Sequence, residues 1–170
     1  IKDIERVTGS LRKVCRVAVT DDVTSGKIAY ADTLVFAGIL TGSSDSLIGR
    51  LLAKTNVDPS MIISKKEVYA FSEVTGFEGL ENKKVFVIAG SDKLGTIYGL
   101  YKLSEMIGVS PWHYFADVKP VVREELSFGP DELPIVSHEP KIEYRGFFLN
   151  DDWPSLGGWV TNAFDDFNEL

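Results

Sequence analysis

Two short apolar runs along the chain are each followed by a polar turn and a stretch with helical spacing. The runs, Thr33–Thr41 and Lys84–Gly90, are typical of strands that are buried on both faces. Glycine, serine and aspartate follow each run and supply helix caps. Apolar positions at helical spacing then predict one helix over residues 46–55 and another from Asp92 to Ile107, where Gly108 fits the end of the helix.

Weaker patterns complete one layered domain. Residues 1–9 predict the last turns of a helix with a glycine cap, and residues 14–20 and 67–75 have the composition of strands. Because helices and strands alternate along the chain, we expect an α/β fold with a small, open, mostly parallel sheet flanked by helices.

The pattern changes after Asp117. Four of the seven prolines fall within Lys119–Pro140, and proline blocks helix formation, so this stretch is predicted to be a connector with a short edge strand at Leu126–Phe128. The next apolar stretch, Ile142–Leu149, is typical of a new strand. We therefore expect an α/β domain over residues 1–118, a connector over 119–140 and the start of a second domain over 141–170.

The composition of the 170 residues is that of a globular protein, with 44% hydrophobic and 25% charged residues. Neither a membrane span nor a signal peptide is expected, because the chain shows no long apolar run and no secretion pattern at its start. A helix pattern that begins at Ile1 indicates a processed or excised piece. The single cysteine and two histidines match no disulfide or metal-site pattern, so no metal is expected.

The net charge of −7 is concentrated in the last third of the chain. Residues 1–116 hold 14 basic and 13 acidic residues, whereas residues 117–170 hold 4 and 12. All three tryptophans lie from position 112 onward. Acidic groups among aromatic rings argue against a nucleic-acid partner and suit a sugar surface, since rings stack on sugars and carboxylates accept hydroxyl hydrogens. A solvated acidic face is the plainer alternative.

The two turns that follow the apolar runs are candidate anion sites. Gly42–Asp45 and Ser91–Lys93 place free backbone N–H groups at helix starts, where an anion is stabilised. Neither turn matches a GxGxxG or GxxxxGK[ST] phosphate loop. Helix capping by serine and aspartate explains the same residues.

Four consecutive rings, Trp112-His113-Tyr114-Phe115, follow the second predicted helix. On an extended chain such side chains alternate between faces, so two rings can form an exposed platform. A hydrophobic plug between domains is the alternative. His113 has no triad partner in the sequence and is interpreted as structural.

The segment Asn150-Asp151-Asp152 stands at the carboxyl end of the strand predicted at Ile142–Leu149. α/β barrels keep catalytic groups at the carboxyl ends of their strands. Aspartate and asparagine are also common in turns and caps, which is the structural alternative. Arg145 falls inside this predicted strand and is interpreted as structural.

Two longer motifs resemble glycoside hydrolase family 115. The first runs through Gly90-Ser91-Asp92-Lys93, Gly95-Thr96-Ile97-Tyr98-Gly99, Ile107–Trp112 and Ala116-Asp117-Val118. The second, Tyr144–Asp151 with Gly158-Trp159-Val160 behind it, resembles the entry into that family's catalytic barrel.

The resemblance implies a xylan α-1,2-glucuronidase, with a small α/β domain followed by a (β/α)8 barrel that is truncated here after its first strand. It implies an inverting reaction that removes glucuronic acid or its 4-O-methyl ether from glucuronoxylan without metal or organic cofactor. Such a reaction uses two carboxyl groups about 6.5–9.5 Å apart. The second carboxyl group would lie outside this chain, so the chain alone is expected to be inactive. We further expect a secreted or periplasmic enzyme with no membrane partner, and a homodimer as the assembly to test.

The resemblance nominates six residues of this chain. Asp151 is the candidate catalytic carboxylate. The candidate substrate-binding residues are Asn150, Asp152, Trp112, Tyr114 and Phe115. The sequence departs from the family pattern at Leu94, where arginine is expected, and at Phe115, where tryptophan is expected.

Two other function classes stay open. The rings at residues 112–115 suit a carbohydrate-binding or docking module that performs no catalysis. The two glycine-containing turns suit a small nucleotide- or anion-binding domain.

Overall fold

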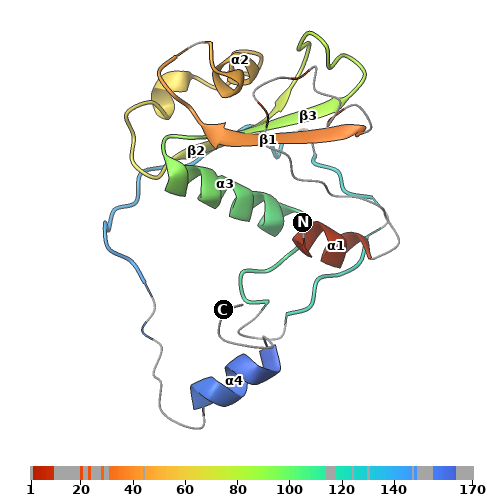
Figure 1. Cartoon of the computed structure of the whole chain (residues 1–170), viewed down its shortest axis with the longest axis vertical. Helices are drawn as coiled ribbons and strands as arrows, with labels where there is room; N and C mark the ends of the chain where they lie inside the picture. The colour runs from red at the N-terminus through yellow and green to blue at the C-terminus, as the bar shows by residue number, and fades with distance from the viewer. Residues whose placement is uncertain are drawn as a thin grey trace.

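The computed structural model of the chain describes residues 2–9, 20, 23, 28, 31–43, 45–113, 118–123, 125–129, 131–146, 148 and 155–163. In chain order, its elements are α1 (Lys2–Thr8), β1 (Thr33–Ile39), α2 (Leu47–Leu52), the 3-10 helix η1 (Pro59–Met61), β2 (Tyr69–Val74), β3 (Lys84–Gly90), α3 (Lys93–Met106), β4 (Ile135–Val136) and α4 (Ser155–Ala163). Figure 1 shows α2 on one side of the sheet and α3 on the other.

The four described strands form one open sheet in the order β1-β3-β2-β4. β1 and β3 are parallel, whereas β2 runs antiparallel to both β3 and β4. The α/β class with flanking helices is confirmed, but the prediction of a mostly parallel sheet is wrong. Residues 75–83 join β2 to β3 without a helix, and so short a connection returns the chain antiparallel.

Both helical layers cover the interior strand β3. Its side chains alternate, with Val85 and Val87 in the main core on the α2 side and Phe86 and Ile88 in a second cluster on the α3 side. Burial on both faces is therefore confirmed for this strand. The same prediction for Thr33–Thr41 is wrong, because β1 lies at the edge of the described sheet and leaves Val35 and Ile39 exposed.

Several local predictions are confirmed. The helix expected over residues 46–55 is α2, and the strand expected over 67–75 is β2. α3 begins after the Asp92 cap, and the chain leaves it through Gly108 at a φ of 107°. The glycine cap of α1 is Gly9, at a φ of 68°. Residues 10–19 lie outside the described residues, so the strand predicted at 14–20 stays a prediction.

The proline-rich stretch packs against the rest of the fold. Phe128 contacts Phe71 and Phe86, with ring centroids 5.6 and 5.2 Å apart in edge-to-face geometry. Leu126 joins the cluster between α1 and the end of α3. The edge strand predicted at Leu126–Phe128 is absent from these described residues, because their side chains fill the two clusters while Ile135–Val136 pairs with β2 instead.

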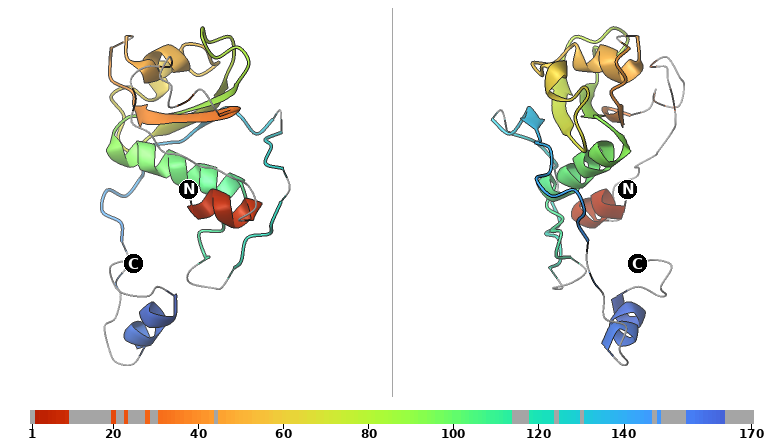
Figure 2. Two further views of the ribbon diagram at one scale, coloured as in Figure 1. Left: turned by 45° about the vertical axis from the view of Figure 1, so that its right-hand side comes forward. Right: turned by 90° about the vertical axis from the view of Figure 1, so that its left-hand side faces the viewer.

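The strand predicted at Ile142–Leu149 is also wrong for its described part. Residues 142–146 and 148 form no strand, and the start of a barrel is not seen in the described residues. Glu143 and Arg145 turn back to Lys66 and Glu67, whereas Tyr144 and Phe148 are almost fully exposed. α4 lies apart from the sheet (Figure 2). The predicted division into residues 1–118, 119–140 and 141–170 stays a prediction.

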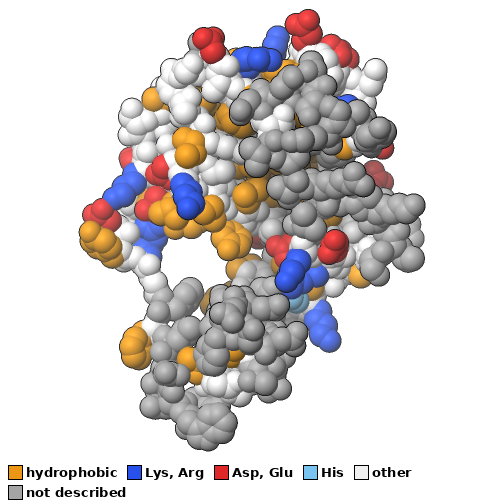
Figure 3. All heavy atoms as spheres, in the orientation of Figure 1, with side chains coloured by type: hydrophobic (Ala, Val, Ile, Leu, Met, Phe, Trp, Pro, Cys, Tyr) orange, Lys and Arg blue, Asp and Glu red, His pale blue; other side chains and the backbone are white. Residues whose placement is uncertain are grey.

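No helix in the described ranges is long and apolar enough to cross a bilayer. Figure 3 shows charged and apolar side chains mixed over the described part of the face it presents.

Candidate functional site

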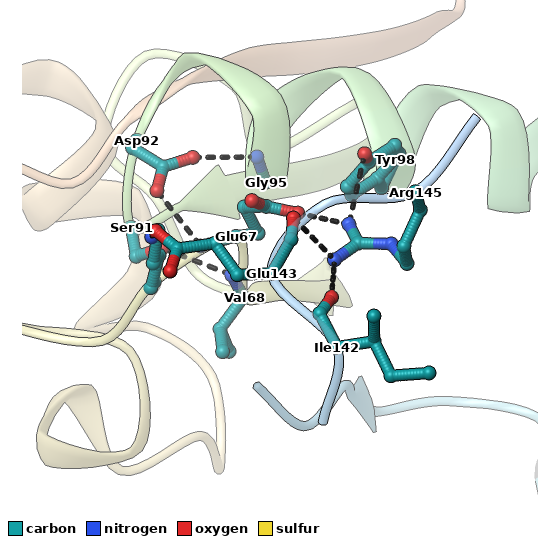
Figure 4. A network of polar contacts seen from close by, with 10 residues as sticks. Glu67, Val68, Ser91, Asp92, Gly95, Tyr98, Ile142, Glu143 and Arg145 are labelled. Atoms are coloured by element: carbon teal, nitrogen blue, oxygen red, sulfur yellow. Dashed lines mark hydrogen bonds and ion pairs between the residues drawn. The ribbon is translucent and has the colours of Figure 1, made fainter. Parts of the chain in front are cut away.

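The turn between β3 and α3 ties the helix to the start of β2. Asp92 caps α3, with Oδ1 accepting the Gly95 N–H at 2.7 Å. Its other carboxylate oxygen accepts the Glu67 N–H at 2.7 Å, and the Ser91 hydroxyl accepts the Val68 N–H at 3.0 Å. Figure 4 shows these contacts converging on residues 67–68. One short turn thus fixes where β2 begins.

Glycines let the backbone of α3 lie in direct contact with residues of the sheet. A Cβ at Gly95 would lie 2.2 Å from the Val68 carbonyl oxygen. A Cβ at Gly99 would lie 2.4 Å from the Ile88 side chain and 3.3 Å from Tyr69. These are the two buried residues of α3. The motif Gly95-Thr96-Ile97-Tyr98-Gly99 therefore has a packing role that sequence reasoning did not identify.

The cap geometry gives the anion-binding alternative no support. Asp92 places its own carboxylate at the start of α3, where an anion would bind. At the other turn, Ser46 caps α2 by accepting the Gly49 N–H at 3.1 Å, and α2 has only six residues. Both turns are explained by helix capping.

Beside this turn, an ion pair joins two segments that lie far apart in the sequence. The Arg145 guanidinium donates to the Glu67 carboxylate and to the Tyr98 hydroxyl, the latter at 3.2 Å. The Glu67 side chain is only 7% exposed. The hydrogen bonds to Glu67 and Tyr98 raise the pKa of Arg145 above its ordinary value. Arg145, interpreted from the sequence as a strand residue, instead anchors an irregular segment.

A second ion pair joins the same two segments but is exposed to solvent. Lys66 donates to the Glu143 carboxylate, and both side chains are more than half exposed. This hydrogen bond raises the pKa of Lys66 and lowers the pKa of Glu143. The Lys66 N–H also donates to Glu139 at 2.9 Å. Residues 139–145 are thus held against residues 66–67 by several polar contacts.

A depression of about 320 Å³ lies beside the buried ion pair. Glu67, Tyr69 and Tyr98 line it from the sheet and α3. The later segment contributes Ser137, His138, Pro140 and Arg145. Tyr69 and Ser137 are also bonded directly, since the Ser137 hydroxyl accepts the Tyr69 N–H at 2.9 Å. The depression combines rings, hydroxyls and a balanced pair of charges.

Trp112 is the one residue nominated from the sequence that falls within the described residues, and it does not line this depression. Trp112 is 59% exposed and lies in the turn that follows α3. Its backbone N–H donates to the Ser110 hydroxyl at 3.1 Å. The other five nominated residues lie outside the described residues, and their roles stay predictions: Asn150, Asp151, Asp152, Tyr114 and Phe115. His113 has a partner, since its Nδ1 lies 3.0 Å from the Val118 carbonyl oxygen. Leu94, at the position where the family pattern expects arginine, is an exposed residue of the first turn of α3.

Sequence reasoning missed Glu67 and Tyr98 and interpreted Arg145 only as structural. Glu67 and Arg145 stand 78 positions apart, so no local pattern connects them. The described residues hold no group of three or more His, Cys, Asp or Glu side chains placed to bind a metal ion.

Comparison with known proteins points to one family of glycosidases. No protein-family model and no curated protein matches the chain. Among solved structures, the chain is similar to BtGH115A, a family GH115 4-O-methyl-alpha-glucuronidase with specificity for decorated arabinogalactans. The identity is 30%, the TM-score is 0.57, and the match covers 77% of this chain. The chain spans about 15% of the length of BtGH115A. It is thus related to part of a GH115 glycoside hydrolase.

Proposed function

We propose, from this relation to a GH115 glucuronidase, that the chain is the N-terminal part of a glycoside hydrolase that removes glucuronic acid or 4-O-methyl-glucuronic acid from a polysaccharide. The observation that carries the proposal is the 30% identity over 77% of the chain. The two sequence motifs quoted above support the same family. In the whole protein we propose a division into residues 1–118, 119–140 and a catalytic barrel that starts at 141.

The proposed substrate is glucuronoxylan. BtGH115A has specificity for decorated arabinogalactans, so a decorated arabinogalactan is the second polysaccharide to test. The two substrates share the uronic acid side group and differ in the main chain. Activity on both, compared at equal uronate content, therefore separates recognition of the uronate from recognition of the main chain.

The proposed mechanism is inversion by two carboxyl groups. One carboxyl group protonates the leaving oxygen, and the other activates water. The two carboxyl groups lie about 6.5–9.5 Å apart. Asp151 is the proposed catalytic carboxylate of this chain, and its partner would come from a later part of the protein. The 170-residue chain alone is accordingly proposed to be inactive. The reaction as proposed needs no metal or organic cofactor, because both proton transfers are made by carboxyl groups.

Around Asp151 we propose a sugar site that includes Asn150 and Asp152, with Tyr114 and Phe115 as stacking rings. We also propose that the whole enzyme is secreted or periplasmic, where plant polysaccharides are accessible. A homodimer is the assembly to test.

A carbohydrate-binding module is the second candidate function. The observation that favours it is Trp112, whose large ring is mostly exposed just after α3. Exposed rings of this kind stack on sugar faces. In this alternative the chain binds polysaccharide and performs no catalysis.

The decisive test replaces Asp151 in the full-length protein that contains these residues. Asp151→Asn keeps the size of the side chain and removes its proton transfer, so we expect uronate release to fall by about 10²-fold or more. The matched control is Asp58→Asn. Asp58 accepts the Ser60 N–H at 2.9 Å at the start of η1, and asparagine caps equally well. Activity of Asp151→Asn equal to that of the control would remove Asp151 from the catalytic role.

A further inference from the structure

The depression beside α3 has two aromatic walls from separate elements. Tyr69 belongs to β2 and Tyr98 to α3, and both line the depression. The helix can lie against Tyr69 because Gly99 has no side chain, since a Cβ there would lie 3.3 Å from the Tyr69 side chain. Burial raises the pKa of Tyr69, which agrees with a ring that is partly withdrawn from water. Pro140 adds a third apolar surface from the later segment.

The polar groups of the depression carry a balanced charge. Arg145 is paired with Glu67, so neither charge is left for a charged ligand (Figure 4). The Tyr98 hydroxyl accepts a hydrogen from Arg145, and its own hydrogen therefore points elsewhere and can be donated. His138 stands exposed at the rim. Such a site offers donors and acceptors without net charge.

The backbone at the floor of the depression is strained. Glu67 has a φ of 57°, in the left-handed region that residues with a side chain seldom adopt. The Asp92 carboxylate holds its N–H, and Arg145 holds its side chain. Strained residues that their surroundings hold in place cluster at ligand sites. This strain is an observation independent of the shape of the depression.

We propose that this depression binds one ring of a neutral sugar, through residues other than those proposed around Asp151. Its volume lies at the small end of the range for small-molecule sites, about 300–1,000 Å³. Tyrosine rings match the C–H faces of a sugar, and the hydroxyl hydrogen of Tyr98 can be donated to one of its hydroxyl groups. The proposal rests on the proposed function only for the kind of sugar, a neutral residue of a plant polysaccharide.

The test is a titration of the 170-residue chain with D-xylose, L-arabinose, D-galactose and D-glucuronate, each followed by amide chemical shifts. We expect at least one neutral sugar to shift the amides of residues 67–69, 98–99 and 137–145. Tyr98→Ala should weaken that binding by about tenfold, and Tyr98→Phe, which keeps the ring and the fold, by a smaller factor.

The matched control is Tyr101→Ala. Tyr101 lies on the same helix, is 68% exposed and does not line the depression, so its loss should leave the affinity unchanged. The proposal is overturned if no neutral sugar shifts these amides, if only D-glucuronate does, or if both Tyr98 variants bind as the unaltered chain does. Failure here leaves the proposed hydrolase activity intact, because that activity is measured as uronate release by the full-length protein.

Discussion

The two turns that lead from strand to helix look alike in sequence and behave differently in the structure. After β1, Gly42 has no atom within 4 Å of the position of a Cβ, and Ser46 caps only its own helix. After β3, Asp92 caps α3 and also holds residue 67 at the start of β2. Glycine and a capping residue thus serve local structure in the first turn and tertiary structure in the second.

The difference extends to how each helix packs. α2 is short and presents Leu51 and Leu52 to the main core. α3 presents Gly95 and Gly99, so the backbones of helix and sheet lie in contact. Close backbone approach is what lets α3 lie against Tyr69, which lines the depression together with Tyr98. We conclude that the second turn, and not the first, builds the candidate site.

The largest expected effect on stability is the difference between substituting a glycine beside the second turn and substituting one in the first turn. Gly95→Ala places a methyl group 2.2 Å from a backbone oxygen that cannot rotate away, so we expect a loss of about 3 kcal/mol in the free energy of unfolding. Gly42→Ala meets open space and should change it by less than about 0.5 kcal/mol. Urea unfolding of both variants measures the difference. Equal losses of unfolding free energy in the two variants would contradict the different roles of the two turns.

The caps give the next largest effect. Asp92→Ala removes a cap and a contact to β2 together, and we expect it to cost about 2–3 kcal/mol. Ser46→Ala removes one cap and should cost about 1 kcal/mol. Thermal unfolding of the two variants tests this order. A Ser46 variant as unstable as the Asp92 variant would show that the second bond of Asp92 contributes nothing.

Of the two ion pairs beside the second turn, the buried one should contribute more to the melting temperature than the exposed one. Glu67→Gln breaks a pair whose carboxylate is buried, so we expect the melting temperature to fall by about 2–4 °C. Glu143→Gln breaks the solvent-exposed pair, and we expect no measurable change at physiological salt. The contrast fails if the Glu143 variant melts at the lower temperature.

The smaller contribution of the exposed ion pair to stability should be measurable at low salt, as a dependence on pH. Lys66 lowers the pKa of Glu143, so this carboxylate stabilises the fold above its ordinary pKa and ceases to do so as the pH falls through the lowered value. Melting curves at low salt should therefore show a small advantage of the unaltered chain over Glu143→Gln at pH 7 that vanishes in acid. An advantage that grows as the pH falls would have the wrong sign.

Local features of the fold could be predicted from the sequence, whereas contacts between distant residues could not. Lys84–Gly90, the Asp92 cap and Gly108 were identified because each depends on neighbours in the chain. The direction of β2 was missed because pairing depends on which strand it meets. Apolar composition also cannot tell an edge strand from a central one, which is why β1 was expected to be buried on both faces.

The candidate site was the harder part to predict for the same reason. Glu67 and Arg145 meet only through the fold. Gly95 and Gly99 are unfavourable in a helix interior, which hints at close packing, but the sequence does not say which residues they pack against. The prediction of a strand around Arg145 rested on the apolar stretch Ile142–Leu149. In the structure, polar contacts to Lys66 and Glu67 hold this segment, and it is irregular.

The most direct test of the proposed activity is to follow the anomeric proton signals of the uronic acid released from glucuronoxylan by the full-length protein. Our account predicts release of glucuronic acid or its 4-O-methyl ether, appearing first as the β-anomer, because inversion of an α-linkage gives that product. First appearance of the α-anomer would contradict the inverting mechanism. No uronic acid release from glucuronoxylan or from decorated arabinogalactan would contradict the proposed function itself.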